Sequence, residues 1–281
     1  MASRLRAKLT AIAHHPRPLR YLWSMLLWHT RLSHWFTVDC GGYRLRYFRT
    51  SMSAGHFVDP DCRAEDDEFL RAWLRPGDRV IDVGANVGTL SLRAAGMVGP
   101  DGHVLAIEAH PRIAACLTAN VALNGFGQVE VRQTALGDAP GEVRFSDDYS
   151  DDQNRVDSAA GGCLVPIARL DDLLTDDERI DLLKIDVEGY ELPVLRGAER
   201  ALARCRCVYF EAADEAYQRY GYTLADIQRL LTEEGFTLYR RAGGRLIPVR
   251  LGGGAPELEN LIAWREPAEA LERTGWLTGE M

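Results

Sequence analysis

From Val80 onward, the 281-residue sequence alternates between short apolar runs and helix-like stretches. The run that starts at Val80 is followed by a helix-like stretch to about Met97, and His103–Glu108 is followed by another from Pro111 to Asn124. Such alternation is typical of an open parallel sheet with helices on both faces. The apolar interiors of the runs fit central strands that are buried on both sides. The sequence therefore predicts an α/β fold.

The second half of the chain continues this pattern and then departs from it. Further strands are expected at Glu130–Gln133, Leu182–Asp186 and Val208–Glu211. After Phe236, two strand-like runs flank a Gly-Gly pair, and "NLIAWRE" follows with no helix between them. We therefore expect a Rossmann-like, seven-stranded sheet that is open and mostly parallel and that ends in an antiparallel strand pair.

The chain divides into three parts. Residues 1–51 are expected to form a basic amphipathic helix followed by a hairpin, because Phe36–Ser51 alternates around two glycines. Residues 52–265 form the α/β domain, and residues 266–281 form a C-terminal tail. Within the domain, the stretch from Gly141 to Pro166 is interpreted as a hairpin that carries a polar loop.

Charge and apolar side chains concentrate at the N-terminus. Residues 1–36 contain six bases and no acid, whereas the remainder has 27 bases against 41 acids. A body this acidic lacks the basic footprint that nucleic-acid binding requires. The helix around Trp23 and Trp28 is too short and too interrupted to span a bilayer. It must cover its own domain, a second subunit or a membrane surface. Self-association as a homodimer is the first choice, and contact with an anionic membrane surface is the second.

The six cysteines contain no CxxC pair. They are expected to be reduced thiols, which indicates a cytoplasmic protein. If the N-terminal segment binds lipid, the expected location is peripheral, at the inner face of the membrane.

The first chemical motif is "VIDVGANVG", which begins at Val80. Gly84 permits a sharp turn, and Gly88 permits close approach of the next helix or of a ligand. A dinucleotide fingerprint needs a glycine where this chain has Asn86. Asp82, just before the turn, repels phosphate but favours an ammonium or sulfonium group.

The second strand then ends in Glu108, within "LAIEAHP". An acid at this place can accept both hydroxyls of a ribose. The two motifs together favour a nucleoside with a cationic, phosphate-free tail, which describes S-adenosylmethionine. The alternative is a structural turn whose Asp or Asn caps the helix.

The second chemical motif is "LLKIDVEGYE", which begins at Leu182. Leu182, Lys184 and Asp186 share one face of the expected strand. A lysine in a buried strand is costly unless it is paired. Asp186 and Glu188 are its expected partners, and a purely structural ion-pair cluster is the alternative.

The chain resembles the FkbM-type methyltransferases, a family with the S-adenosylmethionine-dependent class I fold. The resemblance covers about residues 65 to 265 and rests on "VIDVGANVGTLSL", "IEAHP", "NVALNG", "ALGD", "DLLKIDVEGYELPVLRGA" and "VYFEA". It implies the following cofactor-binding residues: Asp82, Gly84, Ala85, Asn86 and Gly88 along the methionine end, Glu108 at the ribose, and Ala135 and Leu136 beside the adenine. "EAHP" departs from the family, in which an aromatic residue or another proline is common before the final proline.

The resemblance also implies methylation of a hydroxyl oxygen on a sugar, a glycan, or a glycosylated or lipid-linked natural product. An alcohol is a weak nucleophile, so a base must take its proton, and Asp186 is named first for this role. The full set of catalytic candidates is Asp186, Lys184, Glu188 and Glu211. Asp186 and Glu211 are also candidate ligands for Mg²⁺. His56 is a further candidate, expected in a loop and exposed to solvent.

Two other classes of function stay open. One is an NAD-dependent oxidoreductase, which shares the sheet and the ribose acid. The other is a catalytically inactive, methyltransferase-like interaction module. The acceptor pocket is expected to be lined by the N-terminal segment and by the hairpin loop, residues 147–162.

Overall fold

Nine strands form the main sheet of this computed structural model, which describes residues 16–30, 32–145, 155–156, 162–175, 178–242, 244–250, 252, 255 and 258–279. The strands are β3 (Arg79–Val83), β4 (His103–Ile107), β5 (Val129–Arg132), β9 (Leu182–Ile185), β10 (Cys207–Ala212), β11 (Thr237–Ala242), β12 (Arg245–Pro248), β13 (Glu259–Trp264) and β14 (Leu277–Thr278). Their order is β14-β12-β11-β13-β10-β9-β3-β4-β5.

The strand directions confirm the predicted fold class. β5, β4, β3, β9 and β10 run parallel, and β13, β11 and β12 add antiparallel pairs. The sheet has two strands more than the seven predicted: all eight strand-like runs outside the two predicted hairpins join it, β12 included, and residues after Arg265 supply β14. The chain runs outward from β3 to β5 and then returns to β9, on the other side of β3. A sheet binds ligands where its strand order reverses in this way, beyond the carboxyl ends of the strands.

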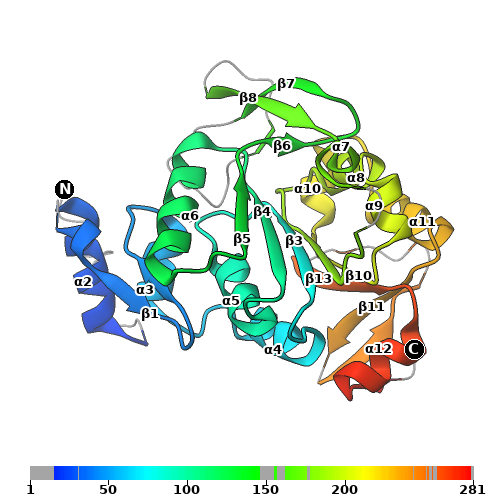
Figure 1. The fold of residues 1–281 in the computed structure, drawn as a ribbon, viewed down its shortest axis with the longest axis horizontal. Coiled ribbons are helices and arrows are strands. Elements are labelled where there is room, and N and C mark those ends of the chain that lie inside the picture. Colours follow the sequence, from blue (N-terminus) through cyan, green and yellow to red (C-terminus); the bar gives the residue numbers. More distant parts are fainter. Residues whose placement is uncertain are drawn as a thin grey trace.

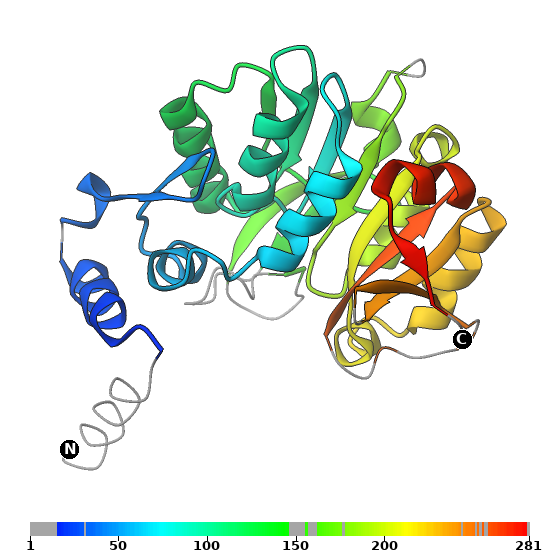
Figure 2. The same cartoon turned by 90° about the horizontal axis from the view of Figure 1, so that it is seen from below.

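Helices cover both faces of the sheet (Figures 1 and 2). One face carries α4 (Ala64–Trp73), α5 (Thr89–Val98), α6 (Pro111–Asn124) and α12 (Pro267–Thr274). The other carries α7 (Leu170–Leu173), α8 (Glu191–Arg196), α9 (Glu199–Ala203), α10 (Asp214–Gln218) and α11 (Leu224–Glu233). Alternate residues of each strand enter the two cores: Val80 contacts the first, and Ile81 and Val83 contact the second.

Local sequence accounts for where the helices begin and end. α6 has Pro111 in its first turn and ends at Gly125, which has a φ of 65°. α11 begins with a capping box between Thr223 and Asp226. The predicted bounds of α6 are confirmed.

Three tryptophans join the C-terminal elements to the domain. The rings of Trp73 and Trp264 lie 5.9 Å apart, and those of Trp264 and Trp276 lie 6.3 Å apart. Trp73 also donates a hydrogen bond to the Asp181 carbonyl. The residues that the sequence analysis assigns to a tail therefore include a helix and an edge strand that pack on the sheet.

A small second sheet lies beyond the ends of β4 and β5 (Figure 1). It consists of β6 (Ala135–Leu136), β7 (Gly141–Phe145) and β8 (Cys163–Ala168). β7 and β8 are antiparallel, which confirms the predicted hairpin. Most of its polar loop lies outside the described residues, but Val156 forms a bridge with Phe145.

The N-terminal elements are α2 (Pro18–His29), the short 3₁₀ helix η1 (Ser33–Trp35), β1 (Thr37–Asp39), β2 (Arg44–Arg46) and α3 (Ser51–Val58). β1 and β2 confirm the predicted hairpin, and its buried residues contact Leu92 of α5. α2 packs against α3. None of the described helices has the length and apolar character that crossing a membrane requires.

His56 differs from its prediction. Thr50 caps a helix by accepting a hydrogen bond from the Ser53 amide, so "SMSAGHFV" is helical rather than a loop. The His56 side chain is only 2% exposed and its Nδ1 lies 3.1 Å from the Met52 carbonyl oxygen. His56 is therefore a buried structural residue and not a solvated loop histidine.

Candidate active site

A cavity of about 390 Å³ lies at the carboxyl ends of β3, β4, β9 and β10. This volume falls within the range typical of small-molecule sites. The predicted residues that line it are Gly84, Ala85, Asn86, Glu108, Ala135, Leu136, Lys184, Asp186, Glu188 and Glu211. The structure thus brings together most of the two residue sets predicted from the separate motifs.

Asp82 and Gly88 are not among the residues that line this cavity. Asp82 is fully buried behind it, where Ser91 donates a hydrogen bond to its carboxylate. Gly88 begins α5 with a φ of 96°, and a Cβ there would lie 2.5 Å from Leu117 Cδ1. Gly88 therefore allows α5 and α6 to pack closely.

The loops after β3 and β9 contact each other directly. A Cβ on Gly84, whose φ is 76°, would lie 1.8 Å from the Asp186 carbonyl oxygen. The Asp186 amide donates to the Val83 carbonyl over 3.0 Å, and Lys184 Nζ donates to the Gly84 carbonyl over 3.2 Å. Only glycine fits this approach, so the glycine of the first motif and the acid of the second form one structural unit.

Two cavity residues have left-handed backbone conformations that L residues seldom adopt. Asn86 has a φ of 50°, and Glu188 has a φ of 56°. Strain of this kind costs about 1–3 kcal/mol per residue and is concentrated at functional sites. Both residues follow the strands that border the cavity.

Glu108 is held by two backbone donors. Its Oε2 accepts from the Asn86 amide over 2.9 Å, and its Oε1 accepts from the His110 amide over 2.8 Å. Burial raises the pKa of Glu108 to about 7, although these hydrogen bonds act in the opposite direction. Each oxygen keeps a lone pair for a further donor such as a sugar hydroxyl.

Lys184 lies between Asp82 of the first motif and Asp186 of the second. Its Nζ lies 3.2 Å from Asp82 Oδ1 and 3.4 Å from Asp186 Oδ2. Burial lowers the pKa of Lys184, but Asp186 and Asp82 outweigh this effect and hold the pKa above its ordinary value. The prediction that Asp186 is a partner of Lys184 is confirmed. The second partner is Asp82, which the sequence had assigned to the cofactor.

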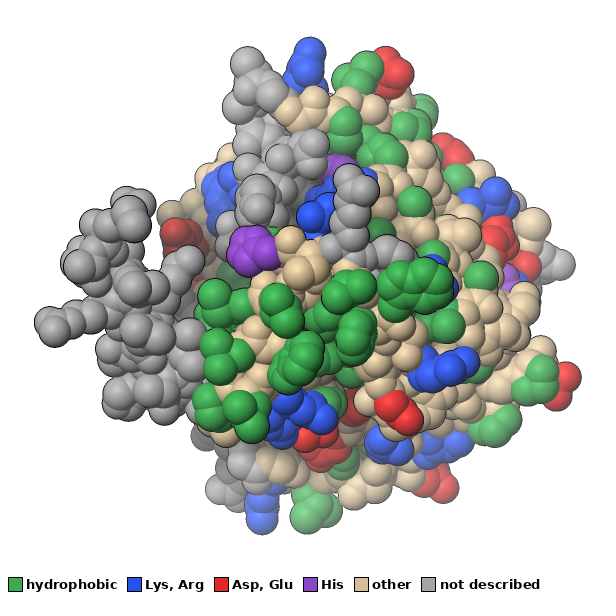
Figure 3. Space-filling view, turned by 90° about the vertical axis from the view of Figure 1, so that its left-hand side faces the viewer, with side chains coloured by type: hydrophobic (Ala, Val, Ile, Leu, Met, Phe, Trp, Pro, Cys, Tyr) green, Lys and Arg blue, Asp and Glu red, His purple; other side chains and the backbone are tan. Residues whose placement is uncertain are grey.

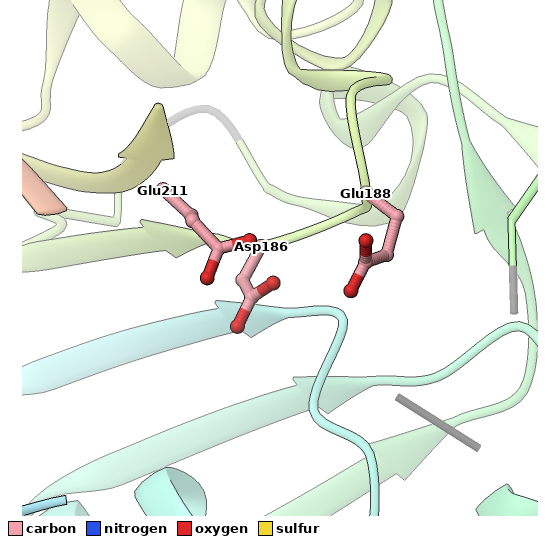
Figure 4. A group of neighbouring side chains, drawn as sticks. All are labelled: Asp186, Glu188 and Glu211. Atoms are coloured by element: carbon pink, nitrogen blue, oxygen red, sulfur yellow. The ribbon is translucent and has the colours of Figure 1, made fainter. Parts of the chain in front are cut away.

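Three carboxylates meet at the ends of β9 and β10 (Figure 4). Ligand atoms of Asp186, Glu188 and Glu211 all lie within 4.8 Å of one another. Burial, followed by the charges of Asp186 and Glu188, raises the pKa of Glu211 to about 9. Glu211 is therefore protonated at neutral pH when the three carboxylates hold no metal ion, and its hydroxyl can act as a donor.

Arg63 is a cavity residue that the sequence analysis missed. It precedes α4, and its guanidinium lies 3.0 Å from Asp66 Oδ2 and 4.0 Å from Asp186 Oδ2. Asp66 in turn accepts a hydrogen bond from the Tyr209 hydroxyl. Arg63 lies just before the region of family resemblance, and no motif marks it. Tyr190 also lines the cavity and was missed, although it stands within the second motif.

The raised carboxyl pKa values predict how stability depends on pH. Burial raises the pKa of Glu108 to about 7 and of Glu191 to about 8, and the pKa of Glu211 is about 9. Because each pKa is higher in the folded than in the unfolded chain, stability should fall as pH rises from about 5 to about 9. Thermal melting measures this slope. Glu211→Gln should flatten it above pH 7, whereas the exposed control Glu233→Gln should leave it unchanged. An equal slope in the Glu211 variant would contradict this assignment.

Comparison with known proteins identifies the family. A model described as "Methyltransferase FkbM domain" matches residues 82–238, which is more than half of the chain. The chain belongs to this FkbM methyltransferase family. It is therefore a S-adenosylmethionine-dependent methyltransferase, and the alternative of an NAD-dependent oxidoreductase is set aside. The matched residues include the second motif and the first motif from Asp82 onward.

Individual relatives are distant. The chain is 28% identical over 234 residues to "Methyltransferase sdnD" of Sordaria araneosa, with 70% of this chain and 88% of the relative covered. It is 30% identical over 253 residues to the AMB antimetabolite synthetase AmbE of Pseudomonas aeruginosa, but it spans 12% of that protein. It is 24% identical to "2-O-methyltransferase NoeI" of Sinorhizobium fredii, with 50% of this chain and 65% of the relative covered.

Among solved structures, an FkbM methyltransferase from Methylobacillus flagellatus is 17% identical, with a TM-score of 0.45. That comparison covers 75% of this chain and 52% of the other.

Proposed function

We propose that this protein is an O-methyltransferase whose acceptor is a hydroxyl on a sugar, a glycan, or a glycosylated or lipid-linked natural product. The observation that carries the proposal is the position of Asp186, which lies at the cavity and is held by Lys184 over 3.4 Å. The name of one distant relative, a 2-O-methyltransferase, supports transfer to oxygen.

The residues present fit S-adenosylmethionine. Glu108 offers two fixed carboxylate oxygens for a ribose diol, and Ile107 and Leu136 offer apolar surface beside it. The Asp186 and Glu188 carboxylates at the cavity provide negative charge for a sulfonium. When bound, S-adenosylmethionine supplies an electrophilic methyl group.

The side chains around the acceptor have separate roles in this proposal. Asp186 accepts the proton of the attacking hydroxyl, and Lys184 holds its carboxylate in place from behind. Glu211, which is protonated at neutral pH, donates a hydrogen bond to an acceptor oxygen and helps to orient it. Lys184 thus acts by positioning Asp186 and not as the base.

Incubating the protein with labelled S-adenosylmethionine and host glycan and lipid extracts tests the proposal. Mass spectrometry should detect products that are heavier by one methyl group in place of hydrogen. Labelling of nitrogen-containing acceptors alone would contradict transfer to oxygen. Binding of the cofactor without any transfer would favour the inactive interaction module.

We also propose that Asp186 works without a metal ion. Lys184 already supplies a positive charge 3.4 Å from the Asp186 carboxylate, which offsets the negative charge that a metal ion would neutralise. A chelator should therefore leave turnover unchanged, measured with and without added Mg²⁺. Loss of turnover that Mg²⁺ restores would instead assign Asp186 and Glu211 as metal ligands.

Glu108→Gln should weaken binding of S-adenosylmethionine by about 1.5–3 kcal/mol, because it replaces charge-assisted hydrogen bonds to the ribose with neutral ones. Titration calorimetry at pH 8, above the pKa of Glu108 of about 7, measures the change. Glu233→Gln, on the remote helix α11, is the matched control. Unchanged affinity in the Glu108 variant would mean that the ribose lies elsewhere.

A further inference from the structure

Helix α2 turns an apolar stripe toward solvent. Leu19, Leu22, Trp23 and Leu26 follow helical spacing and share one face, and they are 74%, 44%, 54% and 49% exposed. Figure 3 shows a continuous group of hydrophobic side chains on the side of the molecule that carries α2. A helix on the surface of a globular protein normally packs such a stripe against the core. In α2 the stripe instead faces solvent.

The residues that follow α2 extend the stripe. Leu32, Trp35 and Phe36 are 56%, 77% and 39% exposed. Of the ten exposed large hydrophobic side chains within the described residues, seven lie between Leu19 and Phe36. We refer to these seven residues as the N-terminal apolar face. A concentration of this kind marks an interaction surface.

The outward orientation of the stripe is fixed by contacts on the opposite side of α2. The Ser24 hydroxyl lies 2.8 Å from the Tyr47 hydroxyl, which also donates to the Ser24 carbonyl over 2.9 Å. Leu27 is fully buried, and Arg17 pairs with Asp59 over 2.9 Å. Polar contacts thus attach the helix to its own domain and leave the apolar face outward.

Charge distinguishes the partners that this face could accept. Residues 1–50 contain nine bases and one acid, whereas the remaining residues contain 24 bases and 40 acids. A symmetric dimer built on this face would bring two copies of the same basic segment together. Like charges would then oppose the association that the apolar side chains favour. An anionic lipid surface can bury the apolar side chains of this face and also attract the bases of residues 1–50.

We propose that the N-terminal apolar face docks on an anionic membrane surface, with α2 lying in the plane of the lipid headgroups. Amphipathic helices bind in this way when apolar side chains insert and flanking bases contact anionic lipids. Tryptophans such as Trp23 and Trp35 suit the interface, where one part of the ring system meets apolar chains and the other meets water. The inference concerns attachment only and does not depend on which acceptor is methylated.

Flotation of the full-length protein with vesicles tests the proposal. The protein should float with vesicles of three parts phosphatidylcholine to one part phosphatidylglycerol, and should float much less with phosphatidylcholine alone. Added salt should weaken binding, because it screens the basic segment.

Two variants separate the apolar and charged contributions. The double variant Trp23→Ser/Leu26→Ser should weaken vesicle binding by about tenfold or more, since each removes a side chain that would enter the lipid. Arg20→Glu, which keeps the whole apolar face, should weaken binding to anionic vesicles by about thirtyfold. Leu277→Ser, at an exposed leucine outside the face, should leave binding unchanged. Equal thermal melting of the variants shows that each is folded.

Three results would overturn the proposal. The first is no flotation with anionic vesicles. The second is equal flotation with neutral and anionic vesicles. The third is a dimer in analytical ultracentrifugation that the Trp23→Ser/Leu26→Ser variant abolishes, because the face would then belong to a second copy of the chain.

Discussion

Asp186→Asn is expected to lower the rate of methyl transfer by about 10²–10⁴-fold, the usual cost of losing a general base. The amide keeps the shape of the carboxylate beside Lys184 but cannot take the proton of the substrate hydroxyl. The affinity for S-adenosylmethionine should change much less, because the proposed ribose contacts come from Glu108, whose carboxylate is held by the Asn86 and His110 amides. The Asp186→Asn variant should therefore bind the cofactor but transfer its methyl group slowly.

Single-turnover kinetics and calorimetry on the same protein samples measure the two quantities for Asp186→Asn. Asp101→Asn, in an exposed turn before β4, is the matched control and should change neither. If affinity and rate fall by the same factor, Asp186 is a cofactor-binding residue and another cavity group takes the proton.

Lys184→Met is expected to destabilise the folded protein by about 3–5 kcal/mol, the cost of leaving a buried charge without its partner. Lys184 is 6% exposed and Asp82 is fully buried, so water cannot replace the lost ion pair. Denaturant unfolding measures the difference. Arg229→Met is the control: its pair with Asp226 is exposed, so the cost should be about 0–1 kcal/mol.

The double variant Lys184→Met/Asp82→Asn tests the reason for this loss. Neutralising Asp82 removes the unpaired buried charge, so the double variant should be more stable than Lys184→Met alone. A double variant whose stability is the sum of two independent losses would mean that Lys184 and Asp82 do not act as a pair. In that case packing, and not charge, would explain the effect of Lys184→Met.

The sheet and the site residues at the ends of its parallel strands could be predicted, because both follow from patterns within short stretches of the sequence. Apolar runs that alternate with helical periodicity determine which strands are buried on both sides, and proline and glycine determine where α6 ends. The carboxyl end of a parallel strand has a fixed position relative to its neighbours. Glu108, Asp186 and Glu211 could therefore be placed together without knowledge of the side-chain contacts.

Contacts between distant segments could not be predicted in this way. Arg63 reaches the cavity because α4 packs on the sheet, and its own sequence neighbourhood carries no motif. Gly88 lies close to Leu117 on a different helix, so its spacing in the motif alone could not decide between close helix packing and approach of a ligand. The apolar pattern of α2 indicated a binding face. Its outward orientation depends on the hydrogen bonds of Ser24 with Tyr47.

The cluster of Trp73, Trp264 and the partly buried Trp276 gives the protein an internal optical reporter. The other three of the six tryptophans all stand between residues 23 and 35. Emission from the buried Trp73 and Trp264 should follow unfolding of the sheet, whereas Trp23 and Trp35, which are 54% and 77% exposed, should respond to quenchers in water. Replacing the N-terminal tryptophans by phenylalanine would leave a signal from the domain core alone. Intrinsic fluorescence can therefore follow events at the two ends of the molecule without an added label.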